Sequence, residues 1–474
     1  MRLAEALREK VEEKRLEREA PLAAIAAQVV VEADRSPLEA VSVLASLDSL
    51  PSVSEAAEGV IKKSLLSLKP LHEQLYEERR DGTWGRILST VAYVEASGLD
   101  PRAVFKDLVK TALRDLRASY EQLSDRFQAM IRVAGVAFGA FPMMVSVMLA
   151  ILASDSVIPL LLAFTLVNLV LAALWTLLAD LQIPEIADYA PFYRRVLAKW
   201  LPLGAAVGAA SYLGLLYLPI SLVYRSPLSL SLGALAFSLP AYLEWRLQAK
   251  VQDELLESLP LVLRGVAEQV SKGFSVHQAL ENVAKAGGLP RYADKLLTLI
   301  LKEARIYGSL RDAYVKVRDL LPKPWRFSLE LLVVAEEVGA GAGAIHSLAD
   351  SVAEYVASVR EFRRKTGAYK WLSLGMAALT LALLGFISHT VMARMAAIGL
   401  LAEQNPVITL PFKPPTPDQL PALKDSIYLA AAANSLALAV VTGKTSGWRM
   451  GDALPELLKT SALLLALLVA LWWA

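Results

Sequence analysis

The chain has 474 residues, of which 55% are hydrophobic and 20% charged, and its formal net charge is +2. It contains no cysteine, which excludes disulfides, thiolate metal ligands and a cysteine nucleophile. The near-neutral charge gives no reason to expect a nucleic-acid partner. The apolar residues gather into runs of about 20, the length at which a helix crosses a bilayer. The composition therefore predicts a polytopic membrane protein.

Residues 1–130 form a first block of soluble character. Apolar residues recur there at helical spacing, as in LAAIAAQVVVEA, without sustained two-residue alternation. Ser36-Pro37 and Asp100-Pro101 each place a proline where it fits the first turn of a helix. We therefore expect an all-helical domain over this block.

Residues 131–245 carry four apolar segments, which we expect to be transmembrane helices over Val133–Leu152, Val157–Leu178, Trp200–Val223 and Leu228–Trp245. The stretch GAAVGAASYLG, from Gly204 to Gly214, is rich in small residues, and such residues let membrane helices approach closely. Apart from Glu244 at the edge of the last span, these segments contain no Asp, Glu, Lys or Arg, which argues against ion-coupled transport.

Residues 246–370 are soluble and helical again, and residues 371–474 contain three further apolar segments: Trp371–Ala393, Ile427–Thr442 and Leu457–Leu471. Between the first two lies NPVITLPFKPPTPDQLP, whose six prolines oppose regular helix. We expect an extended external loop at 405–422. The predicted fold is all-α, with about seven transmembrane helices and two duplicated cytoplasmic helical-bundle domains.

Basic residues near the ends of the spans predict the orientation. They gather on one side of the predicted spans, as Arg126, Arg132, Arg194, Arg195, Lys199, Arg246, Lys250, Arg360, Arg363, Arg364, Lys365, Lys370, Lys444 and Arg449. The opposite loops are poorer in Lys and Arg. We therefore expect a plasma-membrane protein whose N-terminus and both soluble domains are cytoplasmic.

One stretch of the sequence occurs twice. WGRILSTVAYVEASG, ending at Gly98, and WRFSLELLVVAEEVG, ending at Gly339, share Trp, Leu, Glu and Gly at the same offsets. The shared glutamates are Glu95 and Glu336. Both glycines are expected to end a helix in the left-handed conformation.

The similarity extends toward the start of each block. APLAAIAAQVV, with Pro21, parallels LPLVLRGVAEQV, with Pro260, and SPLEAVSVLASL parallels SVHQALENVAKA. Asp34 stands in the first copy where Gly273 stands in the second. The repeated length is a whole domain, so we interpret the chain as a helical domain and its membrane part, duplicated.

These residues resemble the type II secretion system F domain. The second copy carries the resemblance best, in Leu259-Pro260, Gly273-Phe274-Ser275, Ala279-Leu280 and Glu336 to Gly339. Bacterial members of that family have about three spans, whereas the count here is seven, which looks more like the platforms of archaeal pili and the archaellum. The resemblance implies a non-enzymatic membrane platform beneath a filament of pilin subunits, engaged by a hexameric cytoplasmic ATPase.

Charge is distributed unevenly between the two soluble blocks. From Arg264 to Arg326 there are 12 Lys and Arg against 6 Asp and Glu, whereas residues 1–130 carry 19 basic and 22 acidic side chains. The basic stretch suits either an acidic protein partner or anionic lipid. With the family resemblance, it predicts an ATPase-docking surface at Arg264, Lys272, Arg291, Lys295, Arg305, Arg311, Lys316 and Arg318.

Motifs for chemistry are weak throughout. VGAGAGA, from Val338, lacks the spacing of a dinucleotide-binding loop, TGKTS lacks the leading glycine of a phosphate-binding loop, and the four histidines stand singly. We therefore expect no catalytic residue, no metal and no cofactor. Pilins, membrane lipid and a second copy, as a homodimer, are the other expected partners. A transporter or channel is the alternative function, and a membrane signalling scaffold is a third.

Overall fold

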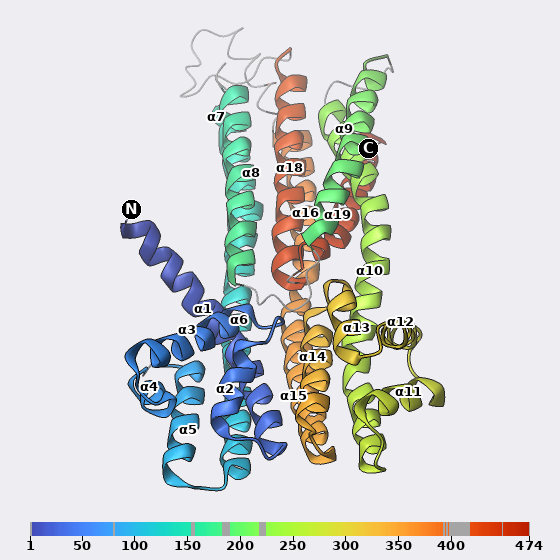
Figure 1. Cartoon of the computed structure of the whole chain (residues 1–474). Coiled ribbons are helices and arrows are strands. Elements are labelled where there is room, and N and C mark those ends of the chain that lie inside the picture. The colour runs from blue at the N-terminus through green and yellow to red at the C-terminus, as the bar shows by residue number, and fades with distance from the viewer. Residues whose placement is uncertain are drawn as a thin grey trace. The chain divides into compact units, whose positions relative to one another are not determined.

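The computed structural model describes residues 2–78, 81–152, 157–182, 190–217, 224–391, 394, 397, 418–447 and 449–473. In these ranges every regular element is a helix and no strand occurs, which confirms the all-α prediction. The chain divides into two compact units (Figure 1). The first unit holds the described residues up to Gln122 and from Ala249 to Glu361, and the second holds those between Leu123 and Gln248 and from Phe362 onward.

Helices of the first unit are, in chain order, α1 (Arg2–Glu32), α2 (Pro37–Ala45), α3 (Pro51–Ser67), α4 (Leu71–Glu77), α5 (Thr83–Ser97), α11 (Val276–Ala286), α12 (Arg291–Tyr307), α13 (Leu310–Val317), η3 (Arg318–Leu320) and α14 (Lys323–Val338). Helices of the second unit are η1 (Val136–Ala140), α7 (Phe141–Leu152), α8 (Val157–Gln182), α9 (Ala190–Tyr217), η4 (Ala368–Trp371), α16 (Leu372–Phe386), η5 (Ile387–Val391), α18 (Leu420–Gly447), η6 (Met450–Asp452) and α19 (Ala453–Trp473). Three long helices carry residues of both units: α6 (Pro101–Gly135), α10 (Arg225–Ser271) and α15 (Ala342–Gly367).

The helix starts in the first unit follow the local signals in the sequence. The Ser36 hydroxyl accepts a hydrogen bond from the Leu38 amide at 3.1 Å, and Pro37 occupies the first turn of α2. The Asp100 carboxylate accepts the Arg102 amide at 3.1 Å, just before α6 begins at Pro101. The two predicted helix starts are therefore confirmed.

The two repeated tryptophans lie in the core of the first unit. Trp84 is 1% exposed and Trp325 is 3% exposed. The indole N–H of Trp325 donates to the Leu255 carbonyl of α10 at 2.6 Å. This hydrogen bond gives the buried indole nitrogen an acceptor. Each Trp therefore anchors its helix to the interior.

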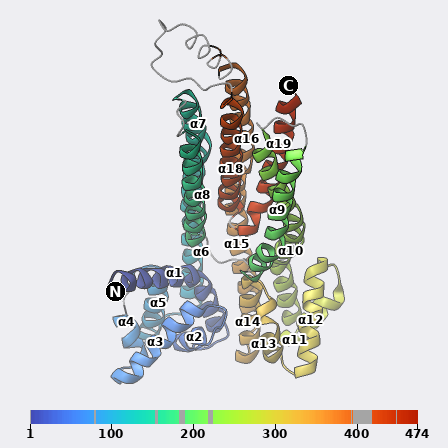
Figure 2. The ribbon, with the colours of Figure 1, turned by 90° about the horizontal axis from the view of Figure 1, so that it is seen from above.

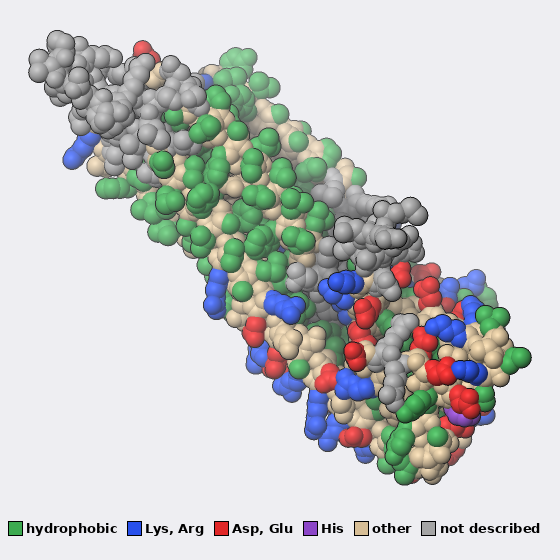
Figure 3. Space-filling view, turned by 90° about the vertical axis from the view of Figure 1, so that its left-hand side faces the viewer, with side chains coloured by type: hydrophobic (Ala, Val, Ile, Leu, Met, Phe, Trp, Pro, Cys, Tyr) green, Lys and Arg blue, Asp and Glu red, His purple; other side chains and the backbone are tan. Residues whose placement is uncertain are grey.

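The predicted multi-pass membrane protein is confirmed by length and composition. Among the described residues, seven helices are long and apolar enough to cross a membrane: Pro101–Ser146, Val157–Ala179, Ala198–Tyr217, Arg225–Ser271, Ala342–Thr390, Leu420–Gly447 and Met450–Trp472. Figure 3 shows one region of the surface covered by hydrophobic side chains and another covered by acidic and basic ones. The predicted boundaries of the four blocks stay a prediction, and most of the proline-rich loop lies outside the described residues.

Helix α18 is the innermost of the seven. The sequence predicted a span over 427–442, whereas the helix runs for 28 residues from Leu420 to Gly447. In the apolar 18-residue segment of this helix, 83% of the residues are buried, and the helix packs against α8, α16 and α19. Ala430, Ala431 and Ala432 are among its buried residues, and such small side chains let neighbouring helices come close.

Glycines bring α9 and α10 into close contact, as the small-residue stretch predicts. A Cβ atom added to Gly233 would lie 2.9 Å from the Gly204 carbonyl oxygen and 3.2 Å from the Gly208 Cα. The neighbouring atoms are backbone and cannot move aside cheaply. The crossing therefore requires glycine.

Charged side chains are buried where α18 meets α19. Lys444 and Glu456 are each 1% exposed and Arg449 is 3% exposed. Lys459 donates to the Glu456 carboxylate at 2.9 Å, and the Arg449 guanidinium lies 5.9 Å from the ring centroid of Trp245. Lys444 and Glu456 fall inside the long apolar helices, although they lie just beyond the shorter spans that the sequence predicted.

Candidate functional site

Half of the predicted docking residues are already engaged within the first unit. Each of four arginines pairs with a carboxylate: Arg264 with Asp350 at 3.4 Å, Arg305 with Glu281 at 2.8 Å, Arg311 with Glu337 at 2.7 Å, and Arg318 with Asp48. All four pairs are partly exposed, and pairs of this kind contribute about 0–1 kcal/mol. Their charge is largely neutralised by their own partners, so they add little to a docking surface.

The remaining predicted residues are more available. Lys272, Arg291 and Lys295 are exposed, and none forms an ion pair in the part of the chain that the structure describes. The Lys316 ammonium lies 5.5 Å from the ring centroid of Tyr307. The structure therefore concentrates the open positive charge at the end of α10 and on the first turns of α12.

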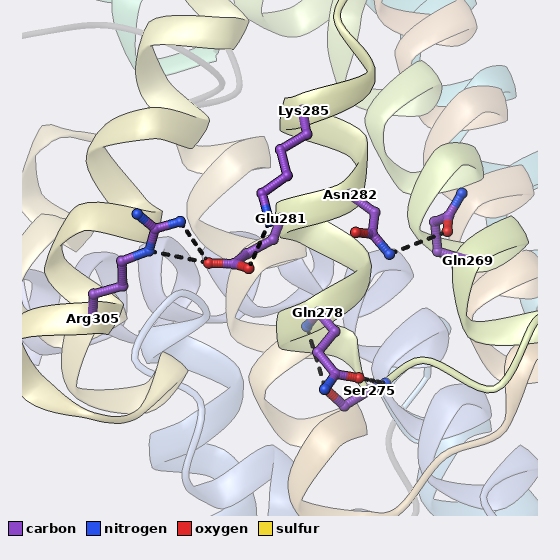
Figure 4. Close-up of polar contacts among 7 residues, drawn as sticks. All are labelled: Gln269, Ser275, Gln278, Glu281, Asn282, Lys285 and Arg305. Carbon is purple, nitrogen blue, oxygen red and sulfur yellow. Dashed lines mark hydrogen bonds and ion pairs between the residues drawn. The ribbon is translucent and has the colours of Figure 1, made fainter.

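Helix α11 is fixed to both of its neighbours (Figure 4). The Arg305 side chain of α12 donates to Glu281 through Nε and Nη2, at 3.1 and 2.8 Å, and Lys285 donates to the same carboxylate at 3.4 Å. Asn282 donates to Gln269 of α10 at 3.4 Å. The hydrogen bond from Arg305 holds the pKa of Glu281 below its ordinary value. These contacts tie α10, α11 and α12 together around the basic surface.

The turns that open α11 and α2 each contain one residue with positive φ. Gly273 has a φ of 91° and Asp34 a φ of 60°, so both residues adopt a left-handed conformation. Two residues later, Ser275 and Ser36 each accept a backbone amide at the start of the helix. Asp34 reaches this conformation because a short polar side chain tolerates it.

The repeated glutamates each accept a hydrogen bond near the start of another helix, one from a hydroxyl and the other from a backbone amide. Glu95 of α5 accepts a hydrogen bond from the Ser36 hydroxyl at 3.4 Å, at the start of α2. Glu336 of α14 accepts the His277 amide at 3.3 Å, at the start of α11. A carboxylate is favourable at a helix N-terminus, where the amides are unsatisfied. Each glutamate is therefore engaged within its own block of the sequence, 1–130 or 246–370.

The helix ends match as well. Gly98 and Gly339 end α5 and α14 in the left-handed conformation, with φ of 66° and 73°, which confirms that prediction. Pro260 lies within α10 as Pro21 lies within α1. Helices α3 and α12 have 17 residues each.

Sequence reasoning missed Glu330, which joins α14 to the turn before α3. Its carboxylate, 6% exposed, accepts the Asp48 amide at 2.8 Å and the Ser49 amide at 3.0 Å. Beside it, Lys323 pairs with Glu19 at 3.0 Å. Burial raises the pKa of Glu330 above its ordinary value, against the opposing effect of these hydrogen bonds. The signal in the sequence was a lone acid inside the apolar run FSLELLVV.

Comparisons of the chain with protein-family models, with curated proteins and with solved structures find no match. The function is therefore argued from the residues and their geometry.

Proposed function

We propose that this chain is a non-enzymatic plasma-membrane platform for a type IV pilus-like filament, which couples a cytoplasmic hexameric ATPase to the insertion or extraction of pilins. The resemblance to the type II secretion system F domain supports this assignment. Both soluble parts and the N-terminus are cytoplasmic in this proposal, because the basic residues gather at their ends of the predicted spans.

The soluble parts are two copies of one helical bundle in this proposal. The supporting observations are the positive φ at Asp34 and Gly273, and the hydrogen bonds that Glu95 and Glu336 accept near the starts of α2 and α11. Independent helices have no reason to repeat turn, cap and carboxylate in the same order. A duplicated bundle accounts for all three.

Continuous helices are the observation that carries the mechanical part of the proposal. Helices α6, α10 and α15 each contain residues of both compact units, and none of the three is interrupted where the units divide. The longest, α10, has 47 residues, which corresponds to about 70 Å of helix. A displacement applied to the soluble end of such a helix is transmitted along its axis.

The ATPase would dock on the open basic residues of the second copy. Reversing three of these charges should weaken ATPase binding while the protein stays folded and inserted, because all three side chains are exposed. The docking variant carries Lys272→Glu, Arg291→Glu and Lys295→Glu. A matched control reverses three exposed charges on α6 of the first copy, as Lys106→Glu, Lys110→Glu and Arg114→Glu. Equal binding by the docking and control variants would remove the assignment of this surface.

The function itself is tested by deleting the chain from the cells that produce it. Filaments should disappear from the cell surface by electron microscopy, while pilins accumulate in the membrane fraction. Complementation with the intact chain should restore the filaments. Normal filaments in the deletion strain would contradict the proposal.

A transporter is the rival function, and one observation favours it. Lys444, Arg449 and Glu456 are buried among the apolar helices, and buried charge at membrane depth commonly marks an ion pathway. In the platform proposal these charges have a structural role, where the end of α18 meets the start of α19. Ion flux through vesicles holding the purified chain, abolished by Glu456→Gln, would favour the transporter.

A further inference from the structure

Two buried hydroxyl groups lie beside the Glu330 carboxylate. Ser49, whose amide donates to Glu330 at 3.0 Å, is 2% exposed, and Tyr314 of α13 is 4% exposed. Neither the Ser49 Oγ nor the Tyr314 Oη has a hydrogen-bond partner among the described residues. Buried side-chain hydroxyls nearly always have a partner, either a protein group or an ordered water molecule. Two such hydroxyls at one place therefore point to a ligand between them.

The contact between α13 and α14 brings Tyr314 level with Glu330. Figures 1 and 2 both show the two helices next to each other, and they are in contact. The Arg326 Nε donates to the Arg318 carbonyl at 2.9 Å. Arg326 comes one helical turn before Glu330 and Arg318 one turn after Tyr314, so this hydrogen bond sets the two residues opposite each other. Burial, and after it the negative charge of Glu330, raises the pKa of Tyr314 above its ordinary value, so the hydroxyl keeps its proton.

The turn between α2 and α3 closes the third side of the site. The Asp48 amide donates to Glu330 at 2.8 Å, and the Asp48 carboxylate pairs with Arg318. The Asp48 and Ser49 amides reach different oxygens of the Glu330 carboxylate. A carboxylate accepts hydrogen bonds at about four positions. Each oxygen therefore keeps a further position for a donor.

We infer that one water molecule binds between the Tyr314 hydroxyl, the Ser49 hydroxyl and the Glu330 carboxylate. The water accepts a hydrogen bond from each hydroxyl and donates one to the carboxylate. Buried waters in proteins typically make about three hydrogen bonds, which is the number that this site offers. The water joins α13 and α14 to the turn before α3. The inference does not depend on the proposed function.

Charge at the site favours a neutral ligand. An anion would be repelled by the Glu330 carboxylate. A calcium or magnesium ion needs about six oxygen ligands, and no group of three or more His, Asp or Glu side chains that could hold a metal occurs in the described part of the chain. The guanidinium groups of Arg318 and Arg326 also disfavour a cation here. Water satisfies both hydroxyls without adding charge.

Millisecond X-ray irradiation of the purified full chain, followed by mass spectrometry, tests the inference, because radicals formed from a bound water label the side chains that touch it. Tyr314 should be labelled several-fold faster than Tyr120 and Tyr355. These two tyrosines are matched controls for burial, since each is 7% exposed and they lie against each other in the same unit. Labelling of Tyr314 no faster than that of the controls would overturn the inference, and would indicate that the hydroxyls turn directly onto Glu330.

Hydrogen exchange in the same preparation separates a bound water from bulk water that enters by local opening. The Asp48 and Ser49 amides should exchange slowly, because their hydrogen bonds to Glu330 keep the turn closed. Fast exchange at both amides would assign the Tyr314 label to bulk water and remove the site.

A pair of variants tests whether Glu330 holds the water. Glu330→Leu removes the acceptor and should slow the labelling of Tyr314 to the rate of Tyr120. Glu337→Leu, at an exposed glutamate of the same helix, is the matched control and should leave the Tyr314 rate unchanged. Fast labelling of Tyr314 that persists in a folded Glu330→Leu variant would contradict the inference. A rise at Tyr120 and Tyr355 would reveal an unfolded variant, and the comparison of tyrosines in the unaltered chain then decides.

Discussion

Leu68 and Gly308 end helices of equal length, α3 and α12, in the same left-handed backbone conformation, with φ of 55° and 80°. Glycine reaches this conformation freely, whereas the Cβ of leucine crowds the following carbonyl oxygen. Among the described residues, Asp34 and Leu68 are the non-glycine positions with positive φ. In the proposed duplication, Gly273 and Gly308 stand at the corresponding positions.

Substitutions at Leu68 and Gly308 test whether both helix ends need the left-handed conformation. Leu68 is 92% exposed, so Leu68→Gly loses little packing and should raise the free energy of unfolding by about 0.5–1 kcal/mol, after the entropy of glycine in the unfolded chain is counted. Gly308→Leu should lower it by about 1–2 kcal/mol. Thermal unfolding of the purified full chain measures both. Shifts of the same sign would contradict the account.

Removing the Glu330 carboxylate should loosen the contact between α14 and the turn before α3. Glu330→Ala leaves the Asp48 and Ser49 amides without their acceptor, and an unsatisfied buried donor costs about 1–3 kcal/mol. Hydrogen exchange at these two amides should accelerate accordingly. Glu337→Ala is the control, because that glutamate forms an exposed pair with Arg311, and it should leave exchange at residues 48 and 49 unchanged.

The raised pKa of Glu330 gives this contact a definite pH dependence. The folded unit binds the Glu330 proton more tightly than the unfolded chain does. The stabilising contribution is therefore complete below the ordinary pKa of glutamate, about 4.3, and is lost as pH rises through the higher folded value. Glu330→Gln cannot titrate. The stability of the intact chain relative to this variant should fall as the pH rises above about 4.3, and a rise would show that the sign is wrong.

The crossing of α9 and α10 should tolerate no side chain at Gly233. Gly233→Ala sets a methyl group 2.9 Å from the Gly204 carbonyl oxygen, and overpacking of this kind costs about 1–3 kcal/mol. Gly214→Ala is the matched control in α9, since an added Cβ there meets nothing within 4 Å. The control should keep the melting temperature in detergent, whereas Gly233→Ala should lower it. Equal melting temperatures would mean that the helices are not in contact at this point.

Local signals in the sequence predicted much of the fold. Ser36-Pro37 marks a helix start through one side chain and one fixed φ, and the Gly98 and Gly339 helix ends need only the left-handed conformation. The spans follow from apolar length alone. Such features depend on neighbouring residues in the chain, so a single sequence reveals them.

Long-range contacts could not be predicted from the sequence. The ion pair of Arg318 with Asp48, and the hydrogen bonds of Glu330 to the turn before α3, join residues about 270 or more positions apart in the chain, and no local pattern encodes such packing. The length of α18 was underestimated because its polar carboxyl-terminal end, around Lys444, is buried by neighbouring helices. Four of the eight basic docking candidates form ion pairs with carboxylates that lie far from them in the sequence, so the sequence alone could not show that they are engaged.

The composition of the complex that the chain forms in its own membrane tests the central claim most directly. A tagged full chain is captured from gently solubilised membranes, and the bound proteins are identified by mass spectrometry. A hexameric ATPase and a pilin should both be retained, and the ATPase should be lost with the variant that reverses Lys272, Arg291 and Lys295 but not with the α6 control. A clean preparation that returns only the chain itself would contradict the platform assignment.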